Sequence, residues 1–168
     1  EAYGPSFLSR APVLYFTTKQ FEVKGEEGNM DSWEGIGDWS FRLIEDKDEL
    51  PEEVILELKK SFGHLDTLEK IKAVYHWMQS RTRYVSIQLG IGGWQPISAQ
   101  EVDRVKYGDC KGLTNYTKAL LKAVGVESFY SVVYGSRTKK DINPDFPQMQ
   151  GNHVILNVPL ADEELWLE

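Results

Sequence analysis

Apolar and polar positions in the middle of the chain follow the period of an α-helix. Apolar residues recur every three or four positions over 51–62 and again from 66 to about 83, which predicts two amphipathic helices. The first opens with Pro51 and two acidic residues, as helix N-termini commonly do. The second has Asp66 or Thr67 in the position of an N-cap.

Two further helices are predicted downstream. Ser98 followed three residues later by Glu101 is a capping-box pattern, which indicates a helical turn over 98–106. Apolar residues then recur at helical spacing after Asp109, a good N-cap residue, and Gly125 supplies a C-terminal stop. The helix after Asp109 is therefore expected to have one buried face.

Alternating apolar and polar positions predict short strands elsewhere. Residues 13–17 and 84–89 have strand composition, and residues 127–134 alternate like a half-buried strand. Residues 24–29 are rich in glycine and acidic residues and are expected to form a loop. Residues 135–151 are expected to form a longer polar loop, and loops of that length inside a compact domain are usually functional or mobile.

Three large apolar residues lie in a stretch without a clear period. Trp33, Trp39 and Phe41 are expected to pack as an arm on the main body, and lining a ligand groove is the alternative use. Residues 1–49 are therefore expected to form an arm or linker from a preceding domain, and residues 50–168 the core.

The last stretch, 152–168, predicts a β-hairpin with a four-residue turn. If Pro159 faces Glu164, the apolar residues of the two strands face one another. The same register brings Glu168 diagonally across from His153 on one face, whereas a slip of one residue would separate them. The pattern that pairs the apolar residues therefore also brings a carboxylate toward an imidazole.

Cys110, the only cysteine, is predicted at the first position of the helix after Asp109. The helix dipole and free N–H groups there favour the thiolate form. An imidazole supplies a base for such a thiol, and a carboxylate behind the imidazole fixes its tautomer. Cys110, His153 and Glu168 are thus the candidate catalytic set, while His64 and His76 lack partners and are expected to be structural or exposed.

Composition excludes several classes of function. With 168 residues, 41% of them hydrophobic and 27% charged, the chain is expected to be one globular domain. A net charge of −7 argues against nucleic-acid binding, and no apolar run is long enough to span a membrane. A lone cysteine excludes an intrachain disulfide and a cysteine-rich metal site. The glycine-rich stretch 90–93 fits no phosphate or dinucleotide motif, so we expect neither cofactor nor metal.

Three motifs resemble those of one family. Tyr107-Gly108-Asp109-Cys110-Lys111 looks like the nucleophile motif of the transglutaminase-like superfamily. Asn152-His153-Val154 and Leu165-Trp166-Leu167-Glu168 are similar to its histidine and acid strands, and Gly92-Gly93-Trp94-Gln95-Pro96 resembles a segment of its bacterial branch. The resemblance covers about residues 50–168. It implies a papain-like α+β fold, with the nucleophile helix packed on an antiparallel β-sheet and additional N-terminal helices.

By this resemblance Cys110 is the nucleophile, His153 the base and Glu168 the third member of a triad. Two positions depart from the family pattern, because the third member is more often Asp and the residue after Cys-Lys is often acidic, whereas this chain has Glu168 and Gly112. The expected activity is thiol-dependent hydrolysis or acyl transfer at amide bonds, through a thioester, as in a cysteine protease.

The Cys110 N–H and one more donor are expected to hold the oxyanion. Gln88, Trp94 and Gln95 are the candidates for the second donor, and each is also compatible with a packing role. Asn152 is a candidate for orienting the imidazole, and a turn role before the strand is the alternative.

Two other functions stay open. The same fold serves equally as an inactive peptide-binding or scaffold module, and the same triad also permits acyl transfer onto a small-molecule amine. The expected partner is a protein or peptide substrate. A chain that starts at Glu1 without Met and ends in a strand pattern is expected to be part of a longer protein with flanking domains. Export to the periplasm or cell surface is suggested only by the family's habit in bacteria.

Overall fold

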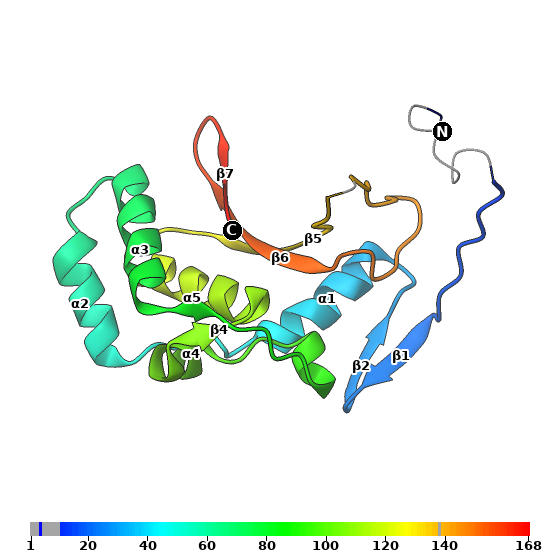
Figure 1. The fold of residues 1–168 in the computed structure, drawn as a ribbon, viewed down its shortest axis with the longest axis horizontal. Helices are drawn as coiled ribbons and strands as arrows, with labels where there is room; N and C mark the ends of the chain where they lie inside the picture. The colour runs from blue at the N-terminus through cyan, green and yellow to red at the C-terminus, as the bar shows by residue number, and fades with distance from the viewer. Residues whose placement is uncertain (1–3, 5–10, 138) are drawn as a thin grey trace.

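The fold combines helices with small β-sheets, as predicted. The computed structural model describes residues 4, 11–137 and 139–168 (Figure 1). The elements in chain order are β1 (Gln20–Val23), β2 (Glu26–Asn29), α1 (Trp33–Ile44), α2 (Glu52–Phe62), α3 (Thr67–Arg81), β3 (Arg83–Tyr84), the 3₁₀ helix η2 (Gly90–Gly93), α4 (Ala99–Val105), β4 (Tyr107–Gly108), α5 (Cys110–Ala123), β5 (Phe129–Val133), β6 (His153–Pro159) and β7 (Glu164–Leu167). Among the described residues, no helix combines the length and apolarity needed to cross a membrane.

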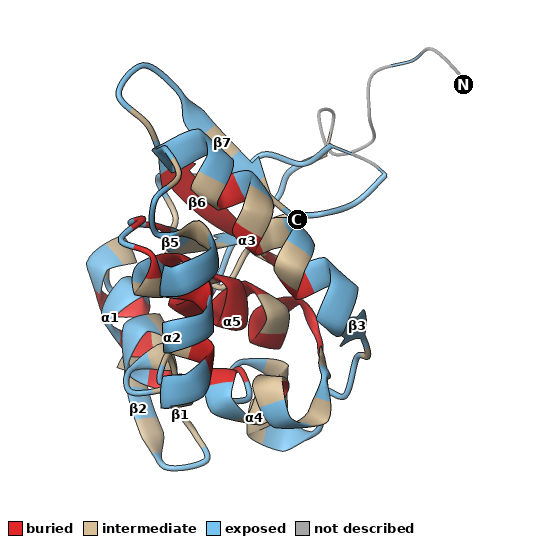
Figure 2. Cartoon of the chain, turned by 90° about the vertical axis from the view of Figure 1, so that its left-hand side faces the viewer, coloured by how far each residue is buried: buried red, intermediate tan, exposed pale blue. Residues whose placement is uncertain are grey.

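Helix α5 is the centre of the hydrophobic core. It packs on β6 on one side and on α2, α3 and α4 on the others, and Figure 2 shows its buried surface enclosed by these elements. Tyr116, Leu120 and Leu121 are fully buried. Full burial of an apolar side chain of this size contributes about 1.5–3 kcal/mol, so this face of α5 holds the helix in one orientation.

The predicted limits of α5 are confirmed. The Asp109 carboxylate accepts a hydrogen bond from the Gly112 N–H at 2.9 Å, which makes it the N-cap. At the other end Gly125 has φ +79°, a left-handed conformation that favours glycine. Cys110 is therefore the first helical residue, as the sequence pattern indicated.

The hairpin register is also confirmed. In the antiparallel sheet β5-β6-β7, Leu156 faces Leu167 and Val158 faces Leu165. The turn is closed by a 2.8 Å hydrogen bond from the Leu160 N–H to the Glu163 carbonyl. Pairing of apolar side chains on the buried face fixes this register.

Helices α2, α3 and α4 lie within a residue or two of their predicted limits. Pro51 is the N-cap of α2, and Asp66 caps α3 by accepting a 2.9 Å hydrogen bond from the Glu69 N–H. Ser98 caps α4 by accepting a 3.2 Å bond from the Glu101 N–H.

Three strand and loop predictions are wrong. Residues 13–17 form no strand, and of the stretch 84–89 only its first residue is in β3, paired in parallel with β4. The Val85 N–H still donates a 2.9 Å hydrogen bond to the Gly108 carbonyl of β4, and the chain then leaves the strand pairing and leads into the glycine-rich helix η2. Residues 24–29 do not form a loop throughout, because β1 and β2 make a hairpin there. Its turn is built by Lys24 and Gly25, both with positive φ.

The expected irregular arm around Trp33, Trp39 and Phe41 is helix α1. Ser32 caps this helix by accepting a 3.1 Å hydrogen bond from the Gly35 N–H. Trp39 is only 2% exposed, which confirms core packing for this residue. Figure 1 shows α1 between the rest of the helices and the β1-β2 hairpin.

The segment after α1 is attached firmly to the core. The Lys47 carbonyl accepts hydrogen bonds from the Ala99 N–H at 2.8 Å and from the Asn115 side-chain amide at 2.7 Å. Asp48 forms ion pairs with Lys118 and Lys122 of α5, at 3.4 Å and 2.8 Å. These bonds attach the segment after α1 to the middle and the C-terminal part of α5.

Candidate active site

Cys110 lies at the N-terminus of α5 and is one of the residues that line a cavity. The residue is 9% exposed, and its thiol forms no hydrogen bond with the described part of the chain. Next to it the Lys111 ammonium is paired with the Asp109 carboxylate, and both side chains are less than 10% exposed. Asp109 therefore both caps α5 and neutralises the buried Lys111 ammonium. These two interactions fix the turn that precedes Cys110.

His153 and Glu168 are joined by a hydrogen bond. Nε2 of His153, the first residue of β6, lies 3.0 Å from Oε1 of Glu168, which follows β7. The predicted approach of carboxylate to imidazole is thus observed. A carboxylate accepts only, so the imidazole donates through Nε2–H, and Nδ1 is left as the proton acceptor.

Neighbouring groups hold this pair in place. The Tyr75 hydroxyl donates a hydrogen bond to the backbone carbonyl of Glu168. Burial raises the pKa of the Tyr75 phenol, and the negative charge of Glu168 raises it further. On the other side the His153 ring packs on Gly135, where a Cβ would come within 3.3–3.5 Å of the His153 side chain. The imidazole thus has little room to turn.

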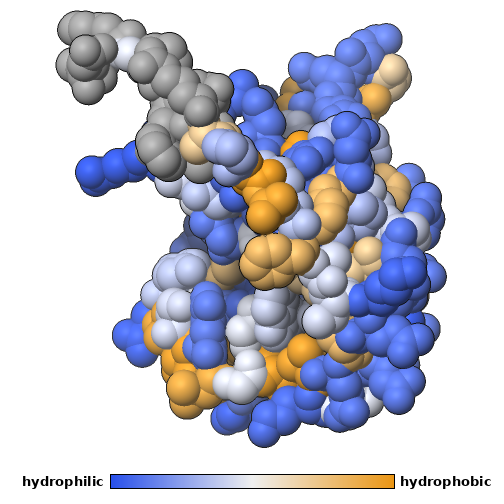
Figure 3. Space-filling model, turned by 90° about the vertical axis from the view of Figure 1, so that its right-hand side faces the viewer, coloured by the Kyte–Doolittle hydropathy of each residue, from blue (hydrophilic) through white to orange (hydrophobic). Residues whose placement is uncertain are grey.

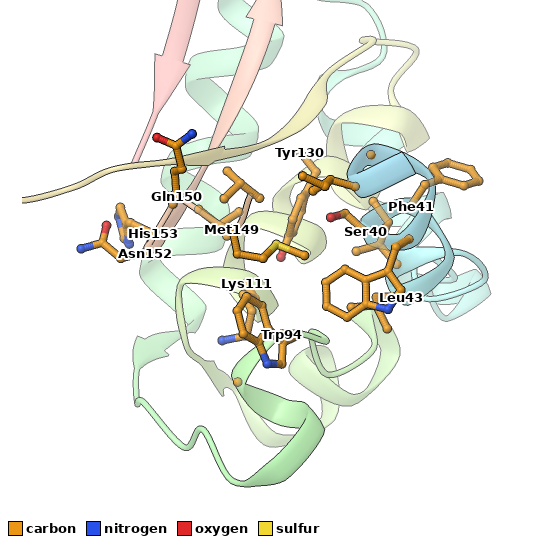
Figure 4. A pocket seen from close by; sticks show the side chains of 18 of the residues that line it. Ser40, Phe41, Leu43, Trp94, Lys111, Tyr130, Met149, Gln150, Asn152 and His153 are labelled. Atoms are coloured by element: carbon orange, nitrogen blue, oxygen red, sulfur yellow. The ribbon is translucent and has the colours of Figure 1, made fainter. Parts of the chain in front are cut away.

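Cys110 and His153 line the same cavity, which has a volume of about 640 Å³. No hydrogen bond joins the thiol to the imidazole, although catalytic contacts are often long before substrate binds. Figure 4 shows His153 and Asn152 at one side of this cavity and residues of α1 at the other. No cluster of potential metal ligands exists among the described residues.

The four supporting candidates from the sequence fall into two groups. Gln88 and Trp94 line the cavity together with Cys110. Gln95 is not in its lining, and its N–H donates a 2.8 Å hydrogen bond to the Ile91 carbonyl. Asn152 is in the lining, but its side-chain amide bonds both backbone groups of Gly135, at 2.8 Å and 3.0 Å.

Two tyrosines near Cys110 were not predicted. Burial raises the pKa of Tyr130, and the negative charges of the Cys110 thiolate and Asp109 raise it further. Burial also raises the pKa of Tyr84, again with the Cys110 charge as the next cause, while hydrogen bonds from Ser86 and the Cys110 backbone oppose the rise. Tyr130 lines the cavity together with Cys110, and the Tyr84 hydroxyl accepts a hydrogen bond from the Cys110 backbone N–H. The alternating pattern of residues 127–134 indicated that Tyr130 lies on a half-buried strand, but nothing in that pattern predicted its closeness to Cys110.

Helix α1 was also not predicted from the sequence. Trp33, Trp39 and Phe41 all line the cavity, so the ligand-groove alternative describes their position as well as core packing does. Trp39 meets Trp94 edge-on with ring centroids 5.7 Å apart. Trp33, Ile36, Trp39 and Leu43 recur every three or four positions after Ser32, so a helical period over 33–44 was the signal that could have found this helix.

The fold resembles that of a solved protein. A crystal structure of a "putative protease" from Parabacteroides distasonis ATCC 8503 superposes with a TM-score of 0.57 at 13% sequence identity. The match covers 79% of this chain and 26% of that protein, so the chain spans about a quarter of its length, and at this identity the likeness concerns the fold. No curated protein matches the chain. The family model of the transglutaminase-like superfamily matches residues 57–168. The chain belongs to the transglutaminase-like superfamily.

Proposed function

We propose that this domain is a thiol-dependent hydrolase or acyltransferase of amide bonds, with Cys110, His153 and Glu168 as its catalytic triad. The observation that carries the proposal is the meeting of Cys110 and His153 in one cavity, with Glu168 bonded to the far nitrogen of the imidazole. Nucleophilic catalysis by a thiol requires an imidazole near the sulfur and a carboxylate behind the imidazole, so this arrangement supports the proposal.

The reaction begins with proton transfer from Cys110 Sγ to Nδ1 of His153. The thiolate attacks the amide carbonyl, a C–S bond forms, and the π electrons move onto the oxygen. When this intermediate collapses, the C–N bond breaks and His153 returns its proton to the leaving amine. The product bound to the enzyme is a thioester. Water, activated by His153, then attacks the thioester, and the C–S bond breaks to release the acid.

The oxyanion needs two donors in this account. The backbone N–H of Cys110 is one, because it lies at the start of α5, where helical N–H groups have no intrahelical partner, and its hydrogen bond to the Tyr84 hydroxyl would be exchanged for one to the oxyanion. The indole N–H of Trp94 is the other, since Trp94 lines the same cavity and the structure gives its indole N–H no hydrogen bond with any described residue. Gln88 is the alternative donor.

Hydrolysis and transfer differ only in the second nucleophile. Incubation of casein with the protein, with and without a primary amine, tests both. Release of new amino termini indicates hydrolysis, and incorporation of the amine indicates transfer. Both are expected to require Cys110 and His153, so Cys110→Ala and His153→Ala abolish them.

His64→Ala is the matched control, because this histidine is exposed and lies outside the cavity. It is expected to keep full activity. Absence of any turnover by a folded wild-type protein favours the scaffold alternative, in which the cavity binds a peptide without cleaving it.

A further inference from the structure

The cavity extends well beyond Cys110 and His153, and its far part is apolar. We propose that this part binds a bulky, uncharged apolar side chain of the acyl-donor peptide, at the residue whose carbonyl is attacked. The inference rests on the proposed function, since it takes the attacked carbonyl to lie at Cys110.

Two walls enclose this apolar part. Helix α1 supplies one wall, which includes Ile36, Trp39 and Leu43, all at least 93% buried. Strand β5 and the loop before β6 supply the other, with Val132 and Met149. In Figure 4 the Met149 side chain reaches across the cavity between Tyr130, Lys111 and the residues of α1. The volume of about 640 Å³ lies within the roughly 300–1,000 Å³ range of ligand sites.

The charge of the lining selects against charged side chains. No aspartate or glutamate lines the cavity, among the residues that the structure describes. Among the described residues of the lining, Lys111 is the only Lys or Arg, and its ammonium is buried and already paired with Asp109. A charged side chain entering here would lose its hydration without gaining a partner, which is strongly unfavourable. An apolar side chain has no such cost.

The rim also exposes apolar surface that a peptide would cover. Trp94, Val132 and Ile142 line the cavity and are 42%, 48% and 39% exposed. Figure 3 shows apolar side chains at the surface on the side of the molecule that carries the β1-β2 hairpin. Burial of this surface favours a peptide over water in the cavity.

Helix α1 lies outside the part of the chain that matches the family model, which begins at residue 57. The Trp33 indole N–H donates a 2.7 Å hydrogen bond to the Pro144 carbonyl, which ties α1 to the opposite loop. The edge-on contact of Trp39 with Trp94 ties α1 to the glycine-rich segment. The two walls are thus fixed relative to each other.

The test uses acetyl-Gly-Xaa coumarin amides that differ only at Xaa, with Phe, Leu, Ala, Lys or Asp, and the full chain as enzyme. The ratio kcat/KM for Phe or Leu over Ala is expected to be about tenfold or more, because one apolar group in a fitted site changes kcat/KM by roughly 10- to 200-fold. Lys and Asp amides are expected to be the poorest. Equal rates for all five, or a preference for Lys or Asp, would overturn the inference.

Two variants test whether the preference for an apolar side chain depends on α1. Ser40 projects into the cavity from α1 in Figure 4, so Ser40→Trp is expected to lower the Phe-to-Ala ratio by about tenfold. Asp38→Trp adds the same bulk on the same helix, at an exposed residue outside the lining, and is expected to leave the ratio unchanged. If Ser40→Trp does not fold, Ile142→Asp at the rim is expected to raise the Lys rate relative to Phe. Equal effects of Ser40→Trp and Asp38→Trp contradict the location.

Binding separates this inference from the proposed function. The Cys110→Ala variant is titrated with acetyl-Gly-Xaa-Gly amides, and the Phe peptide is expected to bind about tenfold more tightly than the Ala peptide. If no amide is turned over but this difference appears, the hydrolase proposal fails and the side-chain site stands. If the amides are turned over but the Phe and Ala peptides differ neither in binding nor in rate, the hydrolase proposal stands and the side-chain site fails.

Discussion

His153 Nε2 and Glu168 Oε1 lie 3.0 Å apart across the β6-β7 hairpin, so the far nitrogen of the imidazole is occupied and Nδ1 remains for the thiol. The register that creates this contact is set by pairs of apolar residues further along the hairpin, such as Val158 with Leu165. The packing of the sheet and the proposed catalytic geometry therefore depend on the same alignment.

Removing the Glu168 carboxylate is expected to lower kcat without changing stability. Its side chain is 78% exposed, so the free energy of unfolding of Glu168→Ala should stay within about 0.5 kcal/mol of the wild type. The imidazole loses its fixed tautomer, and kcat falls roughly 10- to 1,000-fold, less than the ~10⁴-fold seen for a buried triad acid. Steady-state kinetics and urea denaturation measure the two effects. Glu168→Asp, with a shorter carboxylate, is expected to keep part of the activity.

Trp94→Phe tests the second oxyanion donor. Loss of the indole N–H is expected to lower kcat by about 10²–10³-fold with little change in KM, because the bond forms in the transition state. Gln95→Ala is the control, since Gln95 lies outside the cavity lining. Unchanged kcat in Trp94→Phe would leave Gln88 as the remaining candidate among the three.

Asp109→Ala is expected to destabilise the protein strongly. The substitution leaves the buried Lys111 ammonium without a partner, which costs about 3–5 kcal/mol, and it removes a helix cap worth about 1 kcal/mol. The double variant Asp109→Asn, Lys111→Met keeps a capping side chain and removes the charge. Chemical denaturation should show most of the stability restored in it. If the double variant is as unstable as Asp109→Ala, the buried pair is not the cause.

The pH dependence of stability is expected to include a contribution from Asp48. Burial acts to raise the pKa of its carboxyl, but the hydrogen bond from Lys122 and the charges of Lys118 and Lys122 outweigh burial, so the pKa is lowered. A lowered pKa in the folded state stabilises the protein above the unfolded-state value of about 3.9, and this stabilisation is lost as pH falls through the folded-state pKa.

Asp48→Asn should therefore destabilise the protein by about 0.5–1 kcal/mol at pH 7 and by much less near pH 2. Thermal or urea unfolding at both pH values measures the difference. Glu49→Gln, a neighbouring exposed acid, is the control and is expected to have no effect at either pH. An equal loss in Asp48→Asn at both pH values would contradict an electrostatic cause.

Features set by local chemistry were predictable from the sequence. The cap at Asp109 depends on a side chain three residues from the N–H that it bonds, and the hairpin register depends on the alternation of apolar residues within 152–168. Both rules act over short distances along the chain. The predicted proximity of His153 and Glu168 follows from them.

Features set by distant contacts were missed. One of them is the contact of Trp39 in helix α1 with Trp94, which lies 55 residues later in the chain. The closeness of Tyr130 to Cys110 likewise depends on how β5 packs on α5. No local period encodes either relationship.

The most direct test of the catalytic account is the mass of the protein during turnover. The chain is mixed with acetyl-Gly-Phe coumarin amide, quenched in acid, and measured intact and after digestion. The account predicts the addition of one acetyl-Gly-Phe acyl group on Cys110, with no addition in Cys110→Ala and much slower addition in His153→Ala. Hydrolysis of the amide that continues in Cys110→Ala, or acylation at an unchanged rate in His153→Ala, would contradict it.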